Sequence, residues 1–429
     1  MSAPAFTEEQ ARAYMHKLLA TMSQAGGSDL FISADFPPSM KSQGAMKPLT
    51  QQKLNPEVTR ILANSLMNET QRAEFAKEME CNFAISIPGI SRFRVNVFVQ
   101  QRCVGMVIRT IASEIPSFEK LKLPPILKDV VMTKRGLVLV VGATGSGKST
   151  SLAAMIDHRN RTSPGHIITV EDPVEYVHQS QLSLVTHREV GIDTHSWHHA
   201  LKNTLRQAPD VILVGEIRDA ETMEHAIAFA ETGHLCLATL HANSASQTIE
   251  RIINFFSEDR RKQLLMDLSA NLRAIVSQRL VRREDGQGRS AAIEILLNTP
   301  TLAEKIFNGD FHEIKTIMSR SRELGMCTFD AALFDLYDAG LIGFDEALRN
   351  ADSTNELRLN IKLKSKRGEP QATDFGGLAL NPLTKPADLD EGDVQDRTKA
   401  LEERRQREEA QLAAMLEKKR LAQAAAKTA

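Results

Sequence analysis

One segment of the chain has the residue types and the spacing needed to hold a polyphosphate. Residues Gly142–Ser149 match the pattern G-x-x-x-x-G-K-[ST], between an apolar run at Leu137–Val141 and a predicted helix at Ser149–Arg159. Glycines let successive backbone N–H groups point inward at phosphate oxygens, and the helix N-terminus adds partial positive charge. Lys148 can reach the β- and γ-phosphates of ATP, and the Ser149 hydroxyl can bind Mg²⁺. The predicted nucleotide-binding residues are Gly142, Ala143, Thr144, Gly145, Ser146, Gly147, Lys148, Ser149 and Thr150.

A second apolar run ends in an acidic residue. Val211–Val214 is followed by Gly215 and Glu216, and ligands of open α/β sheets bind at the carboxyl ends of the strands. In the usual Walker B pattern an Asp stands where this chain has Gly215, so Glu216 is the one carboxylate that this strand supplies. We predict that Glu216 polarises the attacking water and shares in holding Mg²⁺ through water.

A third group of polar residues follows the apolar run Ile167–Val170. The segment Glu171–Glu175 holds three carboxylates, which can steer Mg²⁺ or water beside the γ-phosphate. Acidic turns are common, so this segment gains weight only from its place in the same predicted sheet. The residue types leave open whether Glu175 or Glu216 abstracts the proton from water, and we favour Glu216.

Two histidines flank a further apolar run. His234 directly precedes the run Leu235–Ala238, and His241 follows the run with two residues between them. A lone histidine is more often structural than functional. Two of them around one strand, next to the strand that carries Glu216, favour a phosphate-sensing role.

The apolar runs that carry these motifs predict an α/β domain. Runs of four or five residues alternate with helical stretches, which is typical of buried parallel strands joined by crossover helices. Helical segments are predicted to dominate from about Ser246 to Leu359. The predicted parallel strands are Leu137–Val141, Ile167–Val170, Val211–Val214 and Leu235–Ala238.

The first part of the chain is predicted to form a small α+β domain. Helical periodicity is present at Glu8–Ser23 and at Asn55–Ala76. Alternation of apolar and polar residues in the strand that begins at Arg92 predicts a sheet with one polar face. The expected strands are Leu30–Ser33, Phe83–Ile87, Arg92–Val99 and Val104–Ile111.

Composition shifts divide the chain into four parts. Residues 1–112 form the first domain, 113–125 a proline-containing linker, and 126–362 the nucleotide-binding domain. Residues 363–429 are predicted to be a flexible linker and a charged helical tail. The tail contains charges of both signs, which is more typical of a solvated helix than of a docking helix.

Charge and composition exclude several classes of protein. Lys and Arg number 53 and Asp and Glu 54, so the formal net charge is −1 and no global field attracts nucleic acid. The apolar runs are too short to span a bilayer, and the N-terminus lacks the features of a secretory signal. The four cysteines have no C-x-x-C spacing, which indicates reduced thiols. We expect a cytoplasmic protein that binds no nucleic acid and reaches membranes only through partners.

Together the motifs resemble those of a known family. The segments Glu171–Glu175, Val214–Asp219 and Thr232–His241 are similar to the Asp box, Walker B and His box of bacterial secretion ATPases. Within that superfamily, residues from about 10 to 362 resemble the type IV pilus retraction ATPases of the PilT/PilU kind. The extension beyond this range, and Phe31 where PilT-type chains usually carry His, favour the PilU branch.

The resemblance implies an assembly and a set of partners. It implies a homo-hexamer in which nucleotide is held between a RecA-like ATPase core and a PAS-like N-terminal domain. It also implies that Arg94 and Arg109, with Arg92 a weaker match, approach the phosphates and stabilise transition-state charge. The implied partners are a related retraction ATPase and the inner-membrane pilus platform protein, at the cytoplasmic face of the inner membrane.

These expectations lead to one hypothesis and two alternatives. The leading hypothesis is an ATP-hydrolysing hexameric motor that drives or assists pilus retraction in twitching motility. One alternative is a catalytically weak ATP-binding accessory subunit whose charged tail docks on a principal motor. The other, a nucleic-acid motor, is disfavoured because the chain is neutral and no basic stripe with interleaved aromatic residues is present.

Overall fold

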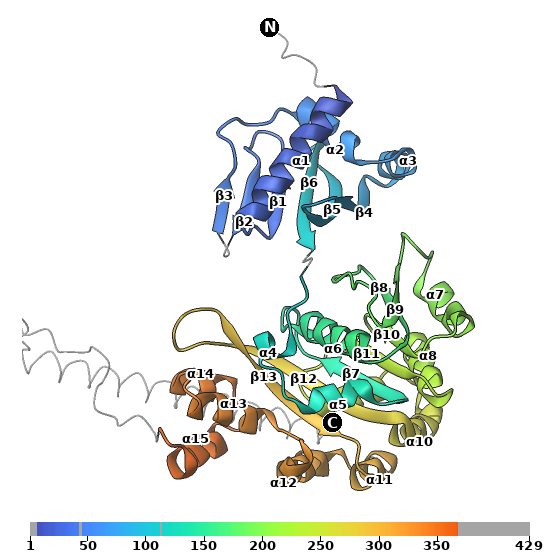
Figure 1. The fold of residues 1–429 in the computed structure, drawn as a ribbon, viewed down its shortest axis with the longest axis vertical. Helices are drawn as coiled ribbons and strands as arrows, with labels where there is room; N and C mark the ends of the chain where they lie inside the picture. The colour runs from blue at the N-terminus through green and yellow to red at the C-terminus, as the bar shows by residue number, and fades with distance from the viewer. Residues whose placement is uncertain (1–6, 43–44, 112–113, 368–429) are drawn as a thin grey trace, which may run out of the picture. The chain divides into compact units, whose positions relative to one another are not determined.

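The computed structural model describes residues 7–42, 45–111 and 114–367. Its strands form a six-stranded and a seven-stranded sheet (Figure 1). Because helices and strands are mixed throughout, the predicted mixture of α+β and α/β elements is confirmed. The predicted charged tail lies outside the described residues.

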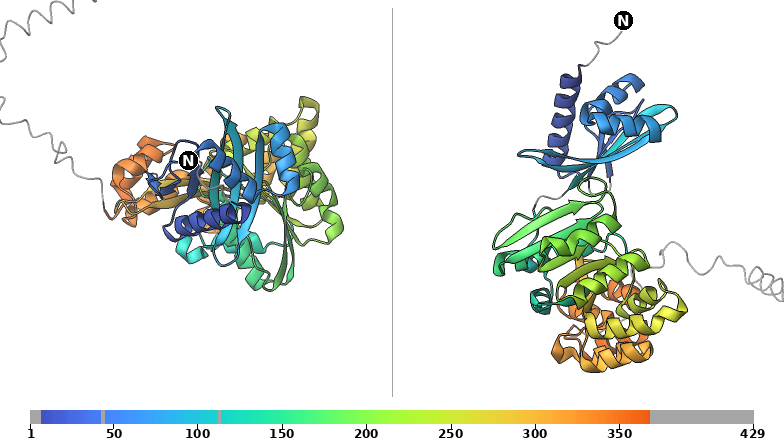
Figure 2. Two further views of the ribbon diagram at one scale, coloured as in Figure 1. Left: turned by 90° about the horizontal axis from the view of Figure 1, so that it is seen from above. Right: turned by 90° about the vertical axis from the view of Figure 1, so that its right-hand side faces the viewer.

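The six-stranded sheet is antiparallel throughout, in the order β3-β2-β1-β6-β5-β4. In the right-hand view of Figure 2, α1 runs along one side of this sheet. Alternate side chains of β5, namely Phe93, Val95 and Val97, are fully buried against the helices. The elements are α1 (Glu8–Gln24), β1 (Asp29–Ile32), β2 (Ser39–Ser42), β3 (Ala45–Pro48), α2 (Pro56–Leu66), α3 (Glu69–Glu78), β4 (Glu80–Ile87), β5 (Ser91–Gln100) and β6 (Cys103–Ile111).

The four strands expected in this region are present, but the helix expected at Asn55–Ala76 is two helices. The chain leaves helical conformation at Met67, whose ψ is 140°. The side chain of Asn68 then accepts a hydrogen bond from the backbone N–H of Gln71, which begins α3 with a capping box. The segments on both sides of the break are helical, and the prediction of one continuous helix missed the break between them.

The seven-stranded sheet has the order β13-β12-β7-β11-β10-β8-β9, parallel except for the antiparallel edge pair β12–β13. All four predicted parallel strands belong to it. The elements are α4 (Phe118–Leu121), α5 (Ile126–Met132), β7 (Gly136–Val141), α6 (Lys148–Thr162), β8 (Gly165–Glu171), β9 (Ser183–Glu189), α7 (Trp197–Thr204), β10 (Val211–Val214), α8 (Ala220–Glu231), β11 (Leu235–Leu240), α9 (Ala245–Ile253), α10 (Arg261–Asn271), β12 (Leu272–Arg282), β13 (Arg289–Leu297), α11 (Pro300–Asn308), α12 (Ile314–Arg320), α13 (Phe329–Asp338), α14 (Phe344–Asn350) and α15 (Thr354–Lys364).

Helices cover both faces of this sheet, and alternate residues of each strand supply the two cores. On β7, Leu137, Leu139 and Val141 pack in one apolar cluster with α8, α9 and α10, whereas Val138 and Val140 pack in the other with α5 and α6. Every residue of β7, β10 and β11 is buried. Burial on both faces explains the uninterrupted apolar runs in these strands.

Helices predominate from Ser246 to Leu359 as predicted, but a long hairpin that the sequence pattern did not predict, β12–β13, interrupts them. β12 pairs with β7 on one side and β13 on the other, over Ala274–Arg282 and Arg289–Leu297. Two residues of β12, Ser277 and Gln278, are polar yet buried. These polar residues break the continuous apolar pattern that identified the other central strands.

Helices lie in the predicted linker and across one of the predicted domain borders. The expected linker at 113–125 contains α4, whose buried Phe118 packs with the core beside α6. At the other border, α15 extends to Lys364, two residues beyond the expected end at 362. Among the helices that the structure describes, none combines the length and apolar character required to cross a bilayer.

Candidate nucleotide-hydrolysis site

The loop after β7 has the backbone conformation expected for holding phosphate. Gly142, Gly145 and Gly147 all have positive φ angles, of 152°, 76° and 89°, and α6 begins directly after Gly147. A Cβ at Gly142 would lie 2.5 Å from both the backbone oxygen of Gln278 and Oγ of Ser146. Only glycine therefore fits this position.

A cavity of about 440 Å³ opens beside the loop and α6. It brings together the loop, the acidic segment and the end of β10. Gly142, Ala143 and Ser146 line an adjoining cavity of about 290 Å³. The residues that line the larger cavity are Thr144, Gly145, Gly147, Lys148, Ser149, Thr150, Glu171, Asp172, Pro173, Glu175, Trp197, Gly215, Glu216, Thr239, His241, Leu280 and Arg289.

The loop fits an anionic ligand. Lys148 Nζ donates hydrogen bonds to the backbone oxygens of Gly142 and Ala143, at 2.9 and 3.1 Å. Burial lowers the pKa of Lys148, and the carboxylates of Glu216 and Glu175 oppose that shift. The buried hydroxyl Ser146 Oγ has no partner among the described residues. A half-buried cation beside an unpaired hydroxyl and inward-curled glycines matches the needs of a phosphate group.

Glu216 projects into the same cavity from the residue pair that follows β10. Its Oε2 accepts a hydrogen bond from Arg218 Nε at 2.6 Å, and its Oε1 lies 2.9 Å from His241 Nε2. The side chain is 21% exposed, so water can reach it while two partners hold it in place. This geometry suits a carboxylate that orients water.

Gly215, which stands where the usual pattern has an Asp, lies close to the neighbouring strand. A Cβ at Gly215 would lie 3.1 Å from both Val170 O and Glu171 Cα, on the neighbouring strand β8. The backbone N–H of Gly215 also donates to Val170 O at 2.8 Å. A side chain at this position would therefore crowd β8 unless the neighbouring strand shifted by a few tenths of an ångström.

The acidic segment supplies Glu171, Asp172 and Glu175 to the cavity wall. Glu171 ends β8 and Glu175 follows it in the loop. Burial raises the pKa of Glu171 to about 7, and hydrogen bonds from Thr169 and the backbone of Glu175 only partly oppose the shift. Glu171 therefore titrates near neutral pH, a property that residue type and spacing did not indicate.

We expect Glu171→Gln to stabilise the nucleotide-free chain more at pH 8 than at pH 5. Folding raises the pKa from 4.5 to about 7, so between these values the folded state binds more protons than the unfolded state. The contribution of this carboxyl to stability therefore falls as pH rises through that window. The gain above pH 7 is at most about 3 kcal/mol. The thermal unfolding midpoints of Glu171→Gln and the wild type at pH 5 and pH 8 measure this gain.

The control for this titration is Glu258→Gln, which changes an exposed carboxylate in the same way. Its thermal midpoint should follow that of the wild type at both pH values. A constant difference between Glu171→Gln and the wild type from pH 5 to pH 8 would contradict the assignment.

The two predicted histidines lie at opposite ends of β11. His241 follows the carboxyl end and lines the cavity, where it contacts Glu216. His234 precedes the amino end, and its Nδ1 lies 3.0 Å from Thr232 Oγ1 and 3.2 Å from Phe229 O, at the end of α8. The six residues of β11 separate them, so the structure brings only His241 to this cavity.

The predicted arginines lie on the antiparallel sheet. Arg94 on β5 and Arg109 on β6 are direct cross-strand partners, so they share one face. Arg109 Nε donates to Asp29 Oδ1 at 2.8 Å, and Arg92 forms a 2.9 Å ion pair with Glu189. Their predicted approach to phosphates stays a prediction.

The β12–β13 hairpin adds residues that the motifs did not identify. Leu280 and Arg289 line the larger cavity, and Gln278 lines the adjoining one. Gln278 Nε2 donates to Ser146 O at 2.8 Å, while its Oε1 accepts from Ser151 Oγ at 2.7 Å. A buried amide therefore ties the phosphate loop and α6 to β12.

We expect Gln278→Ala to lower the thermal midpoint and to raise the KM for ATP. The change leaves Ser146 O and Ser151 Oγ without this partner, at a cost of about 1–3 kcal/mol, and frees the loop to move. Thermal unfolding and steady-state ATP turnover measure the two effects. Gln263→Ala is the control, because Gln263 is exposed and bonds only Asp267 at its own helix. An unchanged KM would contradict the positioning role.

Comparison with known proteins places this site in a family. Residues 8–322 match the family described as Type II/IV secretion system protein. The type IV pilus ATPase PilU of Pseudomonas aeruginosa is 61% identical over 350 residues, which is 82% of this chain and 92% of the relative. The type IV pilus retraction ATPase PilT of the same organism is 41% identical over 78% of this chain and 97% of its own length.

A solved structure has the same fold. The crystal structure of the pilus retraction motor PilT with bound ADP superposes with a TM-score of 0.74 at 38% identity. The match covers 80% of this chain and 98% of that protein. The phosphate loop and the acid that follows β10 agree with these similarities. The chain therefore belongs to the type II/IV secretion system protein family.

Proposed function

We propose that this chain is an ATP-hydrolysing motor of the type IV pilus machinery that drives or assists pilus retraction. The observation that carries the proposal is the placement of Glu216 in one cavity with Lys148 and the glycine loop. The relatives named PilU and PilT, together with the solved retraction motor, support the pilus as the machinery on which it acts.

The proposed reaction is in-line attack of water on the γ-phosphate of ATP, which yields ADP and phosphate. Glu216 accepts a proton from the attacking water, and His241 and Arg218 keep its carboxylate in position. Lys148 and the loop N–H groups stabilise the charge on the phosphate oxygens. Ser149 and, through water, Glu216 would hold Mg²⁺, which supplies further charge neutralisation.

The proposed assembly is a homo-hexamer. The seven-stranded sheet would be a RecA-like core and the six-stranded sheet a PAS-like domain, with nucleotide held between such domains. Arg94 and Arg109, which share one face of the antiparallel sheet, would then approach phosphate. Proposed partners are a related retraction ATPase and the inner-membrane pilus platform, at the cytoplasmic face of that membrane.

A strain that lacks the gene tests the proposal. We expect it to retain surface pili, or to carry an excess, and to show reduced twitching motility. Loss of surface pili would contradict a role in retraction. Complementation with Glu216→Gln then separates the two hypotheses, because restored motility would favour a catalytically weak accessory subunit and failure would favour a motor.

A further inference from the structure

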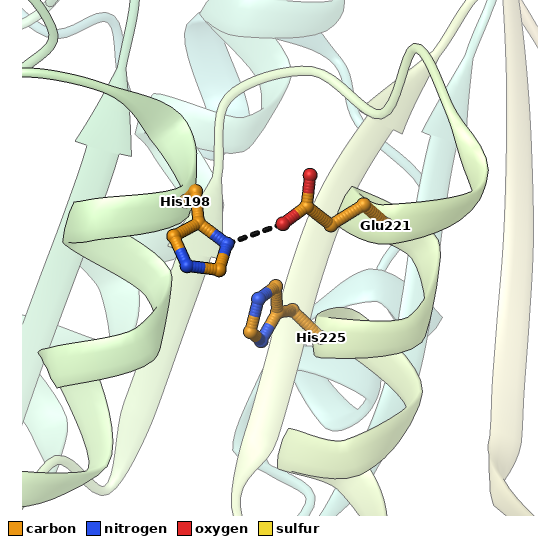
Figure 3. A group of neighbouring side chains, drawn as sticks. All are labelled: His198, Glu221 and His225. Carbon is orange, nitrogen blue, oxygen red and sulfur yellow. Dashed lines mark hydrogen bonds and ion pairs between the residues drawn. The ribbon is translucent and has the colours of Figure 1, made fainter.

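A cluster of metal-ligating side chains lies on α7 and α8. His198 belongs to the first turn of α7, and Glu221 and His225 are four residues apart on α8, hence on one face of that helix. Each offers one ligand atom, and the three atoms all lie within 4.8 Å of one another. Figure 3 shows the three side chains pointing toward one another from the two helices.

Local contacts already orient the cluster. His198 Nδ1 shares a hydrogen bond with Glu221 Oε1, which sets the direction of that imidazole ring. The ring centroids of His198 and His225 are 6.1 Å apart, and His225 stacks on Phe229. The side chains of His198 and Glu221 are 52% and 60% exposed, so ions in solution can reach them.

We propose that His198, Glu221 and His225 bind a divalent transition-metal ion of the Zn²⁺ class. Two imidazoles and one carboxylate form a donor set that Zn²⁺ takes with a water in the fourth position. Imidazole donors favour Zn²⁺, Cu²⁺, Ni²⁺ and Co²⁺, whereas Mg²⁺ prefers oxygen donors. The cluster therefore differs in chemistry from the Mg²⁺ site proposed at the nucleotide.

The cluster needs only a small rearrangement to close on an ion. Tetrahedral Zn²⁺ with bonds of about 2.0–2.1 Å places its ligand atoms about 3.3 Å apart. The exposed side chains of His198 and Glu221 are the groups that would rotate toward the ion.

The bound ion would link α7 and α8, each of which begins at or near a residue that lines the nucleotide cavity. Trp197, next to His198, lines that cavity. Asp219, whose side chain caps α8, lies three residues after Glu216. Metal binding does not depend on ATP hydrolysis, so a failure to bind metal would leave the proposed function intact.

Titration with Co²⁺ tests the proposal, because Trp197 is the one tryptophan of the chain and Co²⁺ quenches nearby indole fluorescence. The experiment uses untagged full-length protein, stripped with a chelator and kept in excess Mg²⁺. We expect saturable quenching at one equivalent, reversed by Zn²⁺, with visible Co²⁺ bands of a four-coordinate site. A near-ultraviolet thiolate charge-transfer band would instead indicate cysteine ligands and overturn the assignment.

Variants show whether these residues are the ligands. Glu221→Gln and His225→Ala should weaken Co²⁺ binding at least tenfold. His199→Ala, which changes the exposed histidine next to His198 on α7, should bind as the wild type does. Glu221→Gln changes an exposed side chain, so it keeps the test valid if His225→Ala fails to fold. Wild-type affinity in Glu221→Gln, or quenching that never saturates, would overturn the proposal.

Discussion

Glu216→Gln is expected to lower the kcat for ATP hydrolysis by about a hundredfold to ten-thousandfold, while nucleotide binding persists. This loss corresponds to about 3–5 kcal/mol of transition-state stabilisation. The amide has nearly the same shape but cannot accept the proton of the attacking water. Steady-state phosphate release measures the rate, and the fluorescence of Trp197, which lines the cavity, measures binding.

Two further variants sharpen this test. Glu258→Gln, in an exposed part of the same domain, should turn over ATP as the wild type does. Glu175→Gln should cost less than Glu216→Gln, because Glu175 is exposed whereas Arg218 and His241 hold Glu216. A larger loss in Glu175→Gln would assign proton abstraction to Glu175. Turnover by Glu216→Gln above about a tenth of the wild-type rate would contradict the role of Glu216.

The part of the site predicted from sequence consists of residues whose chemistry depends on local spacing. The glycine loop, Lys148 and the following helix are contiguous, and Glu216 directly follows a strand recognisable by its apolar run. Parallel strands place their carboxyl ends at one edge, so these segments were expected to meet there. The cavity confirms that meeting.

The remaining part depends on contacts between residues far apart in the chain. Gln278 reaches the loop from a strand 132 residues after Ser146, and local spacing carries no signal of this pairing. The apolar pattern does not predict β12, because two of its buried residues are polar: Gln278 bonds the loop and Ser277 bonds Glu294 on β13. The position of His234, by contrast, can be predicted from the sequence. It precedes β11 and His241 follows β11, so the two histidines must lie at opposite edges of the sheet. That signal was present in the sequence.

Lys148→Ala is expected to weaken ATP binding about 10- to 100-fold and to bring turnover to background. With ATP bound, the ammonium would make charge-assisted hydrogen bonds to phosphate, worth about 1.5–3 kcal/mol in total. The nucleotide-free chain should not lose stability, because burial already disfavours the charged form of this lysine. The rise in thermal midpoint that ATP produces in the wild type should therefore shrink or vanish, while the midpoint without nucleotide stays level.

The thermal midpoints with and without ATP together distinguish a lysine that binds phosphate from one that only stabilises the loop. Lys262→Ala removes an exposed lysine from α10 and should keep both the ATP-induced rise and the turnover. If Lys148 served mainly to hold Gly142 and Ala143 through its two hydrogen bonds, its removal would lower the midpoint without nucleotide. A lowered midpoint with an undiminished response to ATP would contradict the binding role. The expected result instead leaves a folded chain that no longer responds to ATP.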